Sequence, residues 1–404
     1  MKARSEKYQE KRAQILQAAT QTINLKGLKG LLISEVAARL RMAPTSVSYY
    51  FRTKEELAAA CYLRSIETYT ELIQAAAALP TVEQRLSYLV RTFFCRMQEV
   101  AEGRTDEITL FEDLRALGDR EVFKPYVSMF VALRGLLLKD GELPRDTTRV
   151  NAQTHLVLTN FAYAHGWVQE YHPSTFSRAA LRFEDILLRG IGSEKRGWNP
   201  QHLDIVSEAA SVEAHPHEVF LRVATGLINL NGYRGASVEN IVTELNVTRG
   251  AFYHHIDFKD DLIEACYARS VSVIRLAQEA SGRLPVDSRG RLEAILASLV
   301  QRQLVGELQL LRNVFISVPE GMKRNIDVLN RPNETHLVSL ISDGVADGSL
   351  RSVDILIAAR ILSCSLNACV ELSIGNWLPS PLSDRATEHY LRPLFEGLLH
   401  CSAD

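Results

Sequence analysis

Two stretches of the sequence, 41–57 and 246–262, gather side chains that could bind an anion. They read RMAPTSVSYYFRTKEEL and NVTRGAFYHHIDFKDDL, with the aromatic positions kept and the polar positions changed. In the first stretch, Thr53 and Glu56 have the spacing of a capping box, which predicts Lys54 in the first turn of a helix. A cation there opposes the helix dipole unless an anion such as a phosphate lies nearby. We therefore expect Lys54 to face a phosphate-like group.

Each stretch also contains one half of a predicted pair of short helices. ISEVAARL is amphipathic, RMA is a tight connection, and PTSVSYYF starts with Pro44, whose missing N–H costs nothing at the first position of a helix. Two short helices joined by a tight turn form a helix-turn-helix. The second stretch repeats the pattern as VENIVTEL, NVT and RGAFYHHI, with Thr248 suited to cap the second helix.

The whole region is an internal repeat with a constant offset of 205 residues. Asn24-Leu25-x-Gly27-x-x-Gly30 aligns with Asn229-Leu230-x-Gly232-x-x-Gly235, and the alignment continues without a gap. The matches further along the first copy are Leu40, Lys54, Leu57, Ala60-Cys61-Tyr62 and Arg64-Ser65. Such a period is far longer than that of a solenoid, so it indicates two copies of a whole domain pair.

Composition agrees with a globular protein of several domains. The chain has 404 residues, of which 46% are hydrophobic, and a formal charge of -2, which excludes a uniformly basic nucleic-acid binder. Its first residues have no apolar core, and its most apolar segments are interrupted by charges, so we expect a cytoplasmic protein without membrane spans. The six cysteines lack C-x-x-C spacing and are expected to be reduced, mostly buried thiols.

Apolar residues recur at three and four spacings throughout, and no strand is predicted, so the expected fold class is all-α. The polar segment near 193–214, punctuated by glycine and proline, is the expected linker between the two copies. The expected domains are a helix-turn-helix domain at 1–70, a helical domain at 71–192, the linker, a second helix-turn-helix domain at 215–275 and a second helical domain at 276–404.

These features resemble the TetR/AcrR family of bacterial transcriptional regulators. The resemblance rests on the amphipathic first helix, the Gly-x-x-Gly loop, the helix-turn-helix, its aromatic end and the Thr-Lys-Glu-Glu-Leu start of the next helix, and it covers 11–70 and 216–275. Leu31-Leu32, Ile256 and Phe258 depart from the pattern of the family. Members carry one DNA-binding domain and one helical ligand-binding domain, and act as homodimers. The resemblance implies two fused members that form a pseudo-dimer within one monomeric chain, with further dimerisation left open.

The second helix of a helix-turn-helix enters the major groove with its N-terminal residues toward base edges, while flanking groups grip phosphates. The expected base-facing residues are Pro44, Thr45 and Ser46 in the first copy and Arg249, Gly250 and Ala251, behind the cap Thr248, in the second. By resemblance to the family, the phosphate contacts are Ser48, Tyr49 and Lys54, and Tyr253, His254 and Lys259. The basic residues before the first copy, Lys2, Arg4, Lys7, Lys11 and Arg12, could follow the DNA backbone.

By the same resemblance, the helical domains would bind a small and largely apolar effector. The implied function is a ligand-responsive regulator, expected to be a repressor, that binds an operator with two unlike half-sites. Candidate pocket residues are polar or aromatic groups in otherwise apolar helices, although core or interface packing is the favoured explanation for them. They are Tyr126, His155, Tyr163 and Trp167 in the first domain, and Asn367, Glu371 and Trp377 in the second. We expect the last two helices of each domain, about 146–170 with 174–190 and 352–376 with 383–400, to pack as one four-helix bundle.

Other classes of protein receive less support from the sequence. No catalytic motif is present, so an enzyme is not expected, and no cofactor or metal is implied. A metal- or redox-sensing regulator would use His202, His215 and His217 or Cys364 and Cys369, which lack the spacing of metal ligands. A helical interaction protein without DNA binding is a further alternative.

Overall fold

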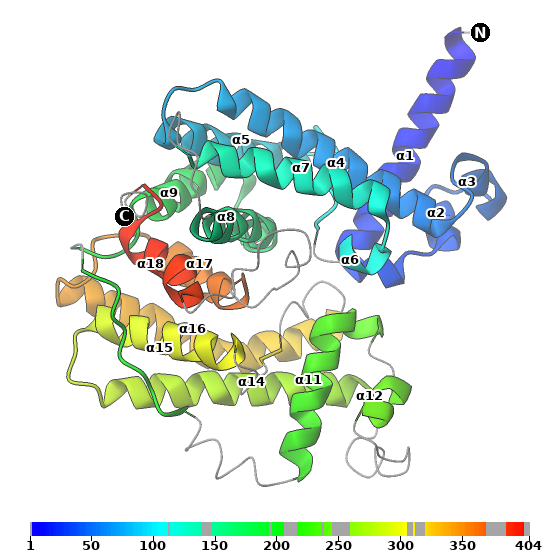
Figure 1. Cartoon of the computed structure of the whole chain (residues 1–404). Helices are drawn as coiled ribbons and strands as arrows, with labels where there is room; N and C mark the ends of the chain where they lie inside the picture. Colours follow the sequence, from blue (N-terminus) through cyan, green and yellow to red (C-terminus); the bar gives the residue numbers. More distant parts are fainter. Residues whose placement is uncertain are drawn as a thin grey trace.

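The structure is a computed structural model of the chain, and it is built from α-helices and short 3₁₀ turns (Figure 1). It describes residues 2–111, 114–138, 147–193, 196–205, 216–235, 238–244, 259–304, 310–311, 320–368 and 385–399. Within these ranges the β-type pairing is limited to an isolated bridge between Gly192 and Leu350. The expected all-α class is confirmed. In the same ranges, no helix has an apolar run long enough to cross a lipid bilayer.

The first head, which we define as residues 2–65, contains the expected helix-turn-helix. Its elements are α1 (Lys2–Lys26), η1 (Leu28–Gly30), α2 (Ile33–Arg39), α3 (Pro44–Tyr50) and the first half of α4 (Lys54–Ala77). α2 and α3 pack against each other, and α1 packs on α2 and α4. Their buried side chains include Ile15, Ala19, Val36, Val47 and Leu57, which are continuous with the hydrophobic core of the helical domain.

The turn between α2 and α3 closes around a strained residue. Arg41 has φ 54°, in the left-handed region that glycine or asparagine usually occupies. The Met42 N–H donates to Ala37 O at 2.8 Å and the Arg41 N–H donates to Ala38 O at 3.0 Å, so both amides after α2 are satisfied. The tight connection predicted from the sequence is therefore present, and it depends on a positive φ at an arginine.

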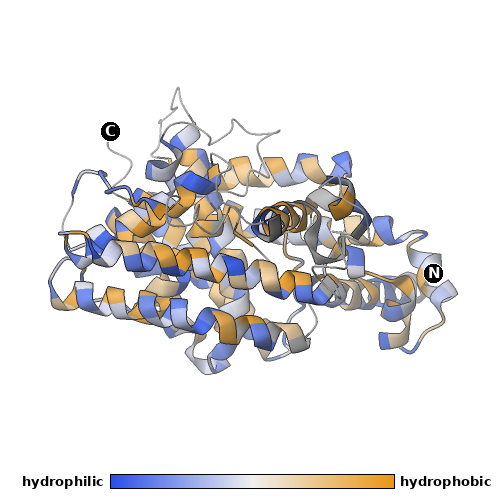
Figure 2. Cartoon of the chain, turned by 90° about the horizontal axis from the view of Figure 1, so that it is seen from below, coloured by the Kyte–Doolittle hydropathy of each residue, from blue (hydrophilic) through white to orange (hydrophobic). Residues whose placement is uncertain are grey.

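The first helical domain, residues 66–193, continues from the second half of α4. Its further elements are α5 (Val82–Ala101), α6 (Leu114–Leu117), α7 (Arg120–Leu136), α8 (Thr148–Trp167), η2 (Val168–Glu170), η3 (Pro173–Thr175) and α9 (Phe176–Arg189). α4 lies along α7, and α5 lies along α9. An aromatic cluster fills the space between them: the ring centroids of Phe93 and Phe161 are 4.5 Å apart, and those of Phe94 and Phe183 are 5.3 Å apart. Hydrophilic and hydrophobic residues alternate along the helices, as Figure 2 shows by colour.

The second half of the chain repeats this order of helices. Its described elements are α11 (Pro216–Gly235), α12 (Val238–Glu244), α14 (Lys259–Gly282), α15 (Ser288–Leu304), α16 (Glu320–Ala346), α17 (Ile355–Ala368) and α18 (Ala386–Glu396). α2 and α12, and likewise α4 and α14, have bounds that differ by 205 residues at both ends. The second head, which we define as residues 216–270, lies on the same side of the molecule as the first, at the right of Figure 1.

The final helices of the two halves pack together within the chain, as predicted. α8 contacts both α17 and α18, and α9 contacts the same two helices. Between the halves, His155 Nδ1 lies 2.9 Å from the buried hydroxyl of Tyr390, and Arg182 pairs with Asp354. These four helices form the centre of the molecule between the two outer helical layers (Figure 1).

Beside this bundle, the chain leaving α9 crosses the end of the second half at backbone distance. The Ile191 N–H donates to Leu394 O at 2.9 Å, and the Gly192 N–H donates to Phe395 O at 2.8 Å. In return, the Leu398 N–H donates to Leu187 O at 3.0 Å. A Cβ at Gly190 would lie 2.3 Å from a Phe395 backbone atom, so this approach requires glycine.

Arg351 reinforces the crossing from the second half. Its Nε donates to Gly190 O at 2.6 Å, and its Nη1 lies 2.6 Å from the Asp185 carboxylate. A further donation runs from Arg351 Nη2 to Asp185 O at 3.0 Å. We call this set of contacts, at 185–193, 349–351 and 394–399, the junction.

The linker leaves the junction along the second helical domain. Leu203 and Ile205 are buried, and the Leu203 N–H donates to Ser298 Oγ at 2.9 Å. Trp198 contacts Phe395, with their ring centroids 6.2 Å apart. The polar composition of 193–214 indicated a surface linker, but apolar residues placed between the polar ones attach 196–205 to the domain.

Replacing Arg41 with glycine should raise the free energy of unfolding by up to about 1 kcal/mol. A left-handed conformation costs a residue with a Cβ about 1–2 kcal/mol, and the larger unfolded-state entropy of glycine offsets part of that gain. Arg41→Ala is the matched control, because it removes the same charge but keeps the Cβ. Urea denaturation of both variants measures the difference, and equal stabilities would contradict strain at this turn.

Candidate nucleic-acid interface

The base-facing residues predicted in the first head lie at the exposed start of α3. Pro44 occupies the first helical position, with Ala43 before it in an extended conformation. Pro44 and Thr45 are exposed and Ser46 is half-buried. Val47 and Phe51 are buried beneath them and hold the helix on the head. α3 therefore presents small polar side chains outward on a fixed apolar base.

The three predicted phosphate contacts of the first head are also exposed. Tyr49 has 74% of its surface exposed, a high value for so large an aromatic side chain. The Ser48 hydroxyl is exposed and donates to Pro44 O at 3.2 Å, so a contact with a phosphate oxygen requires its O–H to turn from Pro44 O to the phosphate. Lys54 is exposed at the first position of α4. All three can approach a polyanion from the side of the molecule on which α3 lies.

The start of α4 is held by its capping residues. Thr53 Oγ1 accepts a hydrogen bond from the Glu56 N–H at 3.1 Å, and Glu56 Oε2 accepts one from the Arg52 N–H at 2.8 Å. The predicted capping box is thus present, although the carboxylate bonds one residue further upstream than in the usual motif. These bonds fix the backbone of Lys54 at the start of the helix. The N–H groups of a helix start favour a bound anion.

The extended N-terminal part of α1 rests on the end of α3. The Tyr8 ring stacks on the Tyr50 ring with centroids 4.8 Å apart, and its edge contacts Tyr49 at 6.2 Å. The Arg12 guanidinium lies 5.0 Å from the centroid of the Phe51 ring. Tyr8 was missed in the sequence, although it lies two helical turns before Ile15 on the same stripe. These contacts direct a basic arm toward the exposed side of the first head.

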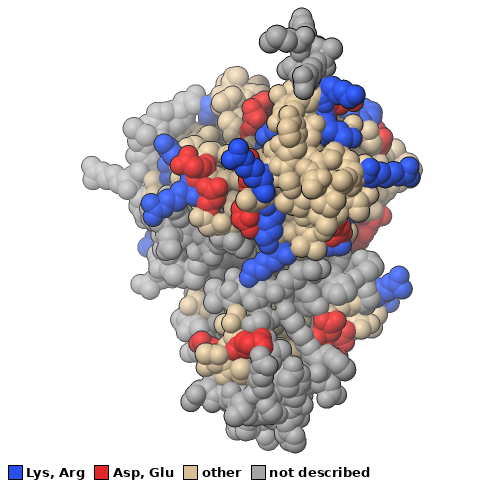
Figure 3. All heavy atoms as spheres, turned by 90° about the vertical axis from the view of Figure 1, so that its right-hand side faces the viewer, with Lys and Arg blue, Asp and Glu red and all other residues tan. Residues whose placement is uncertain are grey.

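Charge is distributed unequally between the heads. Exposed basic residues surround the helix-turn-helix of the first head at Lys29, Arg39, Arg41, Arg52 and Lys54, together with the acidic Glu55 and Glu56. In the described part of the second head and its approach, exposed acidic residues are Asp204, Glu239, Glu244, Asp260 and Asp261. Figure 3 shows this side of the molecule, with basic side chains spread over the half that belongs to the first head.

Most predicted contacts of the second head lie outside the described residues, namely Thr248, Arg249, Gly250, Ala251, Tyr253 and His254. Lys259 is the first residue of α14, as Lys54 is of α4. α12 and α14 flank the segment in the same order as α2 and α4 flank α3. The frame that would hold a second recognition helix is therefore repeated.

The four pocket candidates of the first helical domain do not gather at one point. Tyr126 packs on Phe111 with centroids 5.1 Å apart, whereas Trp167 packs on Phe94 at 6.0 Å. His155 is an interface residue that contacts Tyr390, and Tyr163 is half-buried on α8. In the second domain Asn367 lies on α17, while Glu371 and Trp377 lie outside the described residues. A role in ligand binding stays a prediction for all seven.

Two of the described cysteines, one in each head, are buried thiols with a structural role. Burial raises the pKa of the Cys61 thiol to about 11 and that of Cys266 to about 12. Both thiols donate to a backbone carbonyl of the first helix of their own head, at 3.6 Å to Leu16 O and 3.5 Å to Leu221 O. Among the residues that the structure describes, no three His, Cys, Asp or Glu side chains are grouped as metal ligands would be.

Comparison with known proteins identifies both heads. The family model for bacterial regulatory proteins of the tetR family matches residues 15–61 and again residues 220–266, a separation equal to the 205-residue offset of the repeat. The transposon Tn10 TetC protein of Escherichia coli is 34% identical over 67 residues, which are 15% of this chain and 34% of that protein. The chain thus spans about a third of the length of this relative.

Among solved structures, a transcriptional regulator of the TetR/AcrR family from Thermobifida fusca YX-ER1 aligns with a TM-score of 0.33 and 22% identity. The alignment covers 46% of this chain and 98% of that chain.

A thiol reagent applied to the folded protein should modify Cys95 and spare Cys61, Cys266 and Cys364. Cys95 is exposed, whereas the other three are buried, and the raised pKa of Cys61 and Cys266 leaves almost no reactive thiolate near neutral pH. Mass spectrometry of the labelled peptides measures this order, with the denatured chain as the control in which all sites react. Labelling of Cys61 as fast as Cys95 would contradict it.

Proposed function

Through its two tandem heads the chain belongs to the tetR family of bacterial regulatory proteins, and on this premise we propose that it is a ligand-responsive transcriptional regulator. It would bind one DNA operator with both heads and act in the cytoplasm, as a repressor that an effector releases. The observation that carries the proposal is the exposed, polar start of α3 on a buried apolar base, within a head that occurs twice. This is the arrangement with which a helix-turn-helix reads a major groove.

In the first head, α3 would enter the major groove with Pro44, Thr45 and Ser46 toward the bases. Ser48, Tyr49 and Lys54 would contact phosphates on either side, because hydroxyl, phenol and ammonium groups all donate to phosphate oxygens. The arm of α1, held by Tyr8, would add Lys7 and Lys11 to the backbone contacts. The first head would therefore provide the larger share of the salt-dependent affinity.

In the second head, Arg249, Gly250 and Ala251 would face the bases, with Thr248 capping the helix. An arginine can bind guanine with two hydrogen bonds, and the first head has no arginine at the matching position. Tyr253, His254 and Lys259 would contact phosphates. The two heads would then read different half-sites.

One chain would do what two chains do in a homodimer. The packing of α8 and α9 against α17 and α18 supports this proposal, since it occupies the helices that family members use for dimerisation. Association within a chain has a high effective concentration and does not depend on protein concentration. Dimerisation of whole chains remains compatible with this arrangement through other surfaces.

The effector would be a small, largely apolar molecule bound in the helical domains. Tyr126, His155, Tyr163 and Trp167 are the candidates in the first domain, and Asn367, Glu371 and Trp377 in the second. Release of DNA requires that the ligand bind more tightly to a state whose head spacing differs from that of the operator. The family assignment favours such a regulator over an enzyme.

Selection of bound sequences from random DNA should yield an operator with two unlike half-sites about one helical turn, or a multiple of it, apart. The reason is that Thr45-Ser46 and Arg249-Gly250 present different hydrogen-bonding groups. Sedimentation of the complex should give one chain per duplex. A perfect palindrome bound by two chains would contradict the proposal, and the absence of any selected sequence would favour a helical interaction protein.

Lys54→Ala should weaken binding to all DNA sequences alike and reduce the slope of log affinity against log salt by about one, because one phosphate contact is lost. Lys124→Ala is the matched control, since Lys124 is exposed on α7 in the helical domain. Fluorescence anisotropy at several salt concentrations measures both slopes. An unchanged slope in Lys54→Ala would remove this residue from the interface.

A further inference from the structure

Several residues kept in both copies of the repeat take no part in the helix-turn-helix. They include Asn24 and Asn229 and, on the long helix after each helix-turn-helix, Ser65 and Ser270. Ser65 and Ser270 are buried, and Asn24 and Asn229 are half-buried. DNA contact therefore does not explain the retention of these four side chains, and their hydrogen bonds indicate another role.

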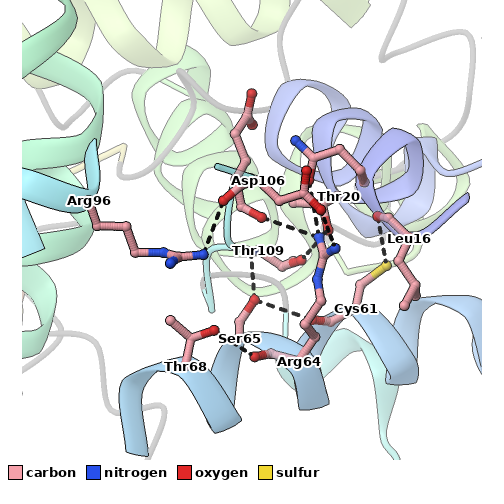
Figure 4. Close-up of polar contacts among 11 residues, drawn as sticks. Leu16, Thr20, Cys61, Arg64, Ser65, Thr68, Arg96, Asp106 and Thr109 are labelled. Atoms are coloured by element: carbon pink, nitrogen blue, oxygen red, sulfur yellow. Dashed lines mark hydrogen bonds and ion pairs between the residues drawn. The ribbon is translucent and has the colours of Figure 1, made fainter. Parts of the chain in front are cut away.

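In the first copy, these side chains hold a segment of the helical domain, residues 106–110, that lies between α5 and α6. Asn24 Nδ2 donates to Ile108 O at 2.9 Å, and Asn24 Oδ1 accepts from the Leu110 N–H at 3.0 Å. Ser65 Oγ accepts from the Thr109 N–H at 2.7 Å (Figure 4). Two side chains of the head thus satisfy three consecutive backbone residues of the segment, much as a neighbouring strand would.

Arg64 fastens the same segment from the next position on α4 (Figure 4). Its guanidinium donates to the Asp106 carboxylate at 3.1 Å and to Glu107 O at 3.2 Å. It also donates to Thr20 Oγ1 on α1 at 3.0 Å, and that hydroxyl lies 2.9 Å from the hydroxyl of Thr109. The segment, α1 and α4 are therefore joined by one hydrogen-bonded network.

The second copy repeats the asparagine-to-carbonyl and serine-to-amide bonds with a segment at a different distance along the chain. Asn229 Nδ2 donates to Leu310 O at 2.8 Å, and Ser270 Oγ accepts from the Leu311 N–H at 2.8 Å. The two side chains are shifted by 205 residues from Asn24 and Ser65, whereas the bonded segment is shifted by 202, from 108–109 to 310–311. The contact is thus retained although the connection before it has a different length.

The arginine behaves differently in the two copies. Arg269, which corresponds to Arg64, forms a buried ion pair with Glu218 of α11, where the first copy has Ala13. Asparagine and serine are therefore the shared elements of the contact.

These bonds lie where the long helix α4 passes from the head into the helical domain. Residues of α4 before Ser65, such as Leu57 and Tyr62, are buried in the head, whereas Tyr69 and Ile73 are buried after it, in the part of α4 that runs into the helical domain. Ser65 lies between these two groups. The Thr109 N–H is hydrogen-bonded to the buried Ser65. If the segment left the head, a buried polar group would lose its hydrogen-bond partner, which is strongly unfavourable. The head is thereby held in one orientation on its domain.

We propose that Asn24 and Ser65, and their counterparts Asn229 and Ser270, are positioning residues that fix each head on its own helical domain. Where the proposed function holds, they set the distance between half-sites that the two heads can bind together. The contact acts through the pose of the head and touches neither bases nor phosphates.

The test combines the double variant Asn24→Ala/Ser65→Ala with a matched control. Thr70→Val removes a hydroxyl of the same helix that donates to Ile66 O within α4 and does not reach the segment. Spin labels at cysteines introduced for Gln14 and Glu239, both exposed, report the distance between the heads by double electron-electron resonance. Cys95, Cys369 and Cys401 are replaced by serine in all variants. We expect a broadened or shifted distance distribution in the double variant and an unchanged one in Thr70→Val.

The second readout is binding to the selected operator and to versions with one or two base pairs added or removed between the half-sites. The starting protein should prefer one spacing by a factor in the usual range of coupling, about 5- to 150-fold. In the double variant this preference should fall towards one, while affinity for a single half-site stays the same. A loss of single-site affinity with preserved spacing preference would assign a merely structural role and overturn the proposal.

Asn24→Asp serves as a milder variant in case the double variant is unstable. It can still accept from the Leu110 N–H, but it cannot donate to Ile108 O, and it places a carboxylate near that of Glu107. The same change in head distance is expected. Unchanged distances in both variants would overturn the proposal, whereas a failure of the starting protein to select DNA would overturn the proposed function and leave the label distances to decide the role of the contact.

Discussion

The apolar faces of the last two helices of each half can be buried only against another pair, and this requirement organises the whole molecule. α8 and α9 find that pair in α17 and α18 of the same chain. Burial of such faces is the main favourable term in association, and covalent connection removes the entropy cost of bringing two chains together. The bundle then places both long helices, α4 and α14, so that the two heads emerge on one side of the molecule (Figure 1).

The junction fixes the register in which these apolar faces pack. Apolar surfaces alone tolerate sliding, but the backbone crossing at Gly190 and the bonds of Arg351 to Gly190 and Asp185 permit one register. The linker leaves from this point and is attached through Leu203 and Ile205. The described part of the connection, residues 196–205, is therefore packed on the second helical domain.

Within this symmetric frame the two heads have diverged in their polar surfaces. The first head has an arm that rests on α3 through Tyr8 and Tyr50, and basic residues surround its helix-turn-helix. Acidic residues are exposed on the described part of the second head and its approach. Burial constrains the apolar positions of both copies equally, whereas exposed positions are free to change. A tandem chain can thus keep one fold and present two different surfaces.

The sequence alone determined the all-α class, the repeat and the helix-turn-helix with its exposed α3. Helix positions depend on neighbours within a few residues, and the repeat is visible by direct alignment of the sequence with itself. The stripe of Ile15 and Ala19, the proline at the start of α3 and the caps of α4 are such local features. Tertiary structure decided the contacts between distant residues. His155 was predicted for a pocket, yet it contacts Tyr390, 235 residues away, and Asn24 was seen only as part of a repeat, yet it holds Ile108 and Leu110. Periodicity shows which side of a helix is buried, but the partner of that side depends on how whole helices pack in three dimensions.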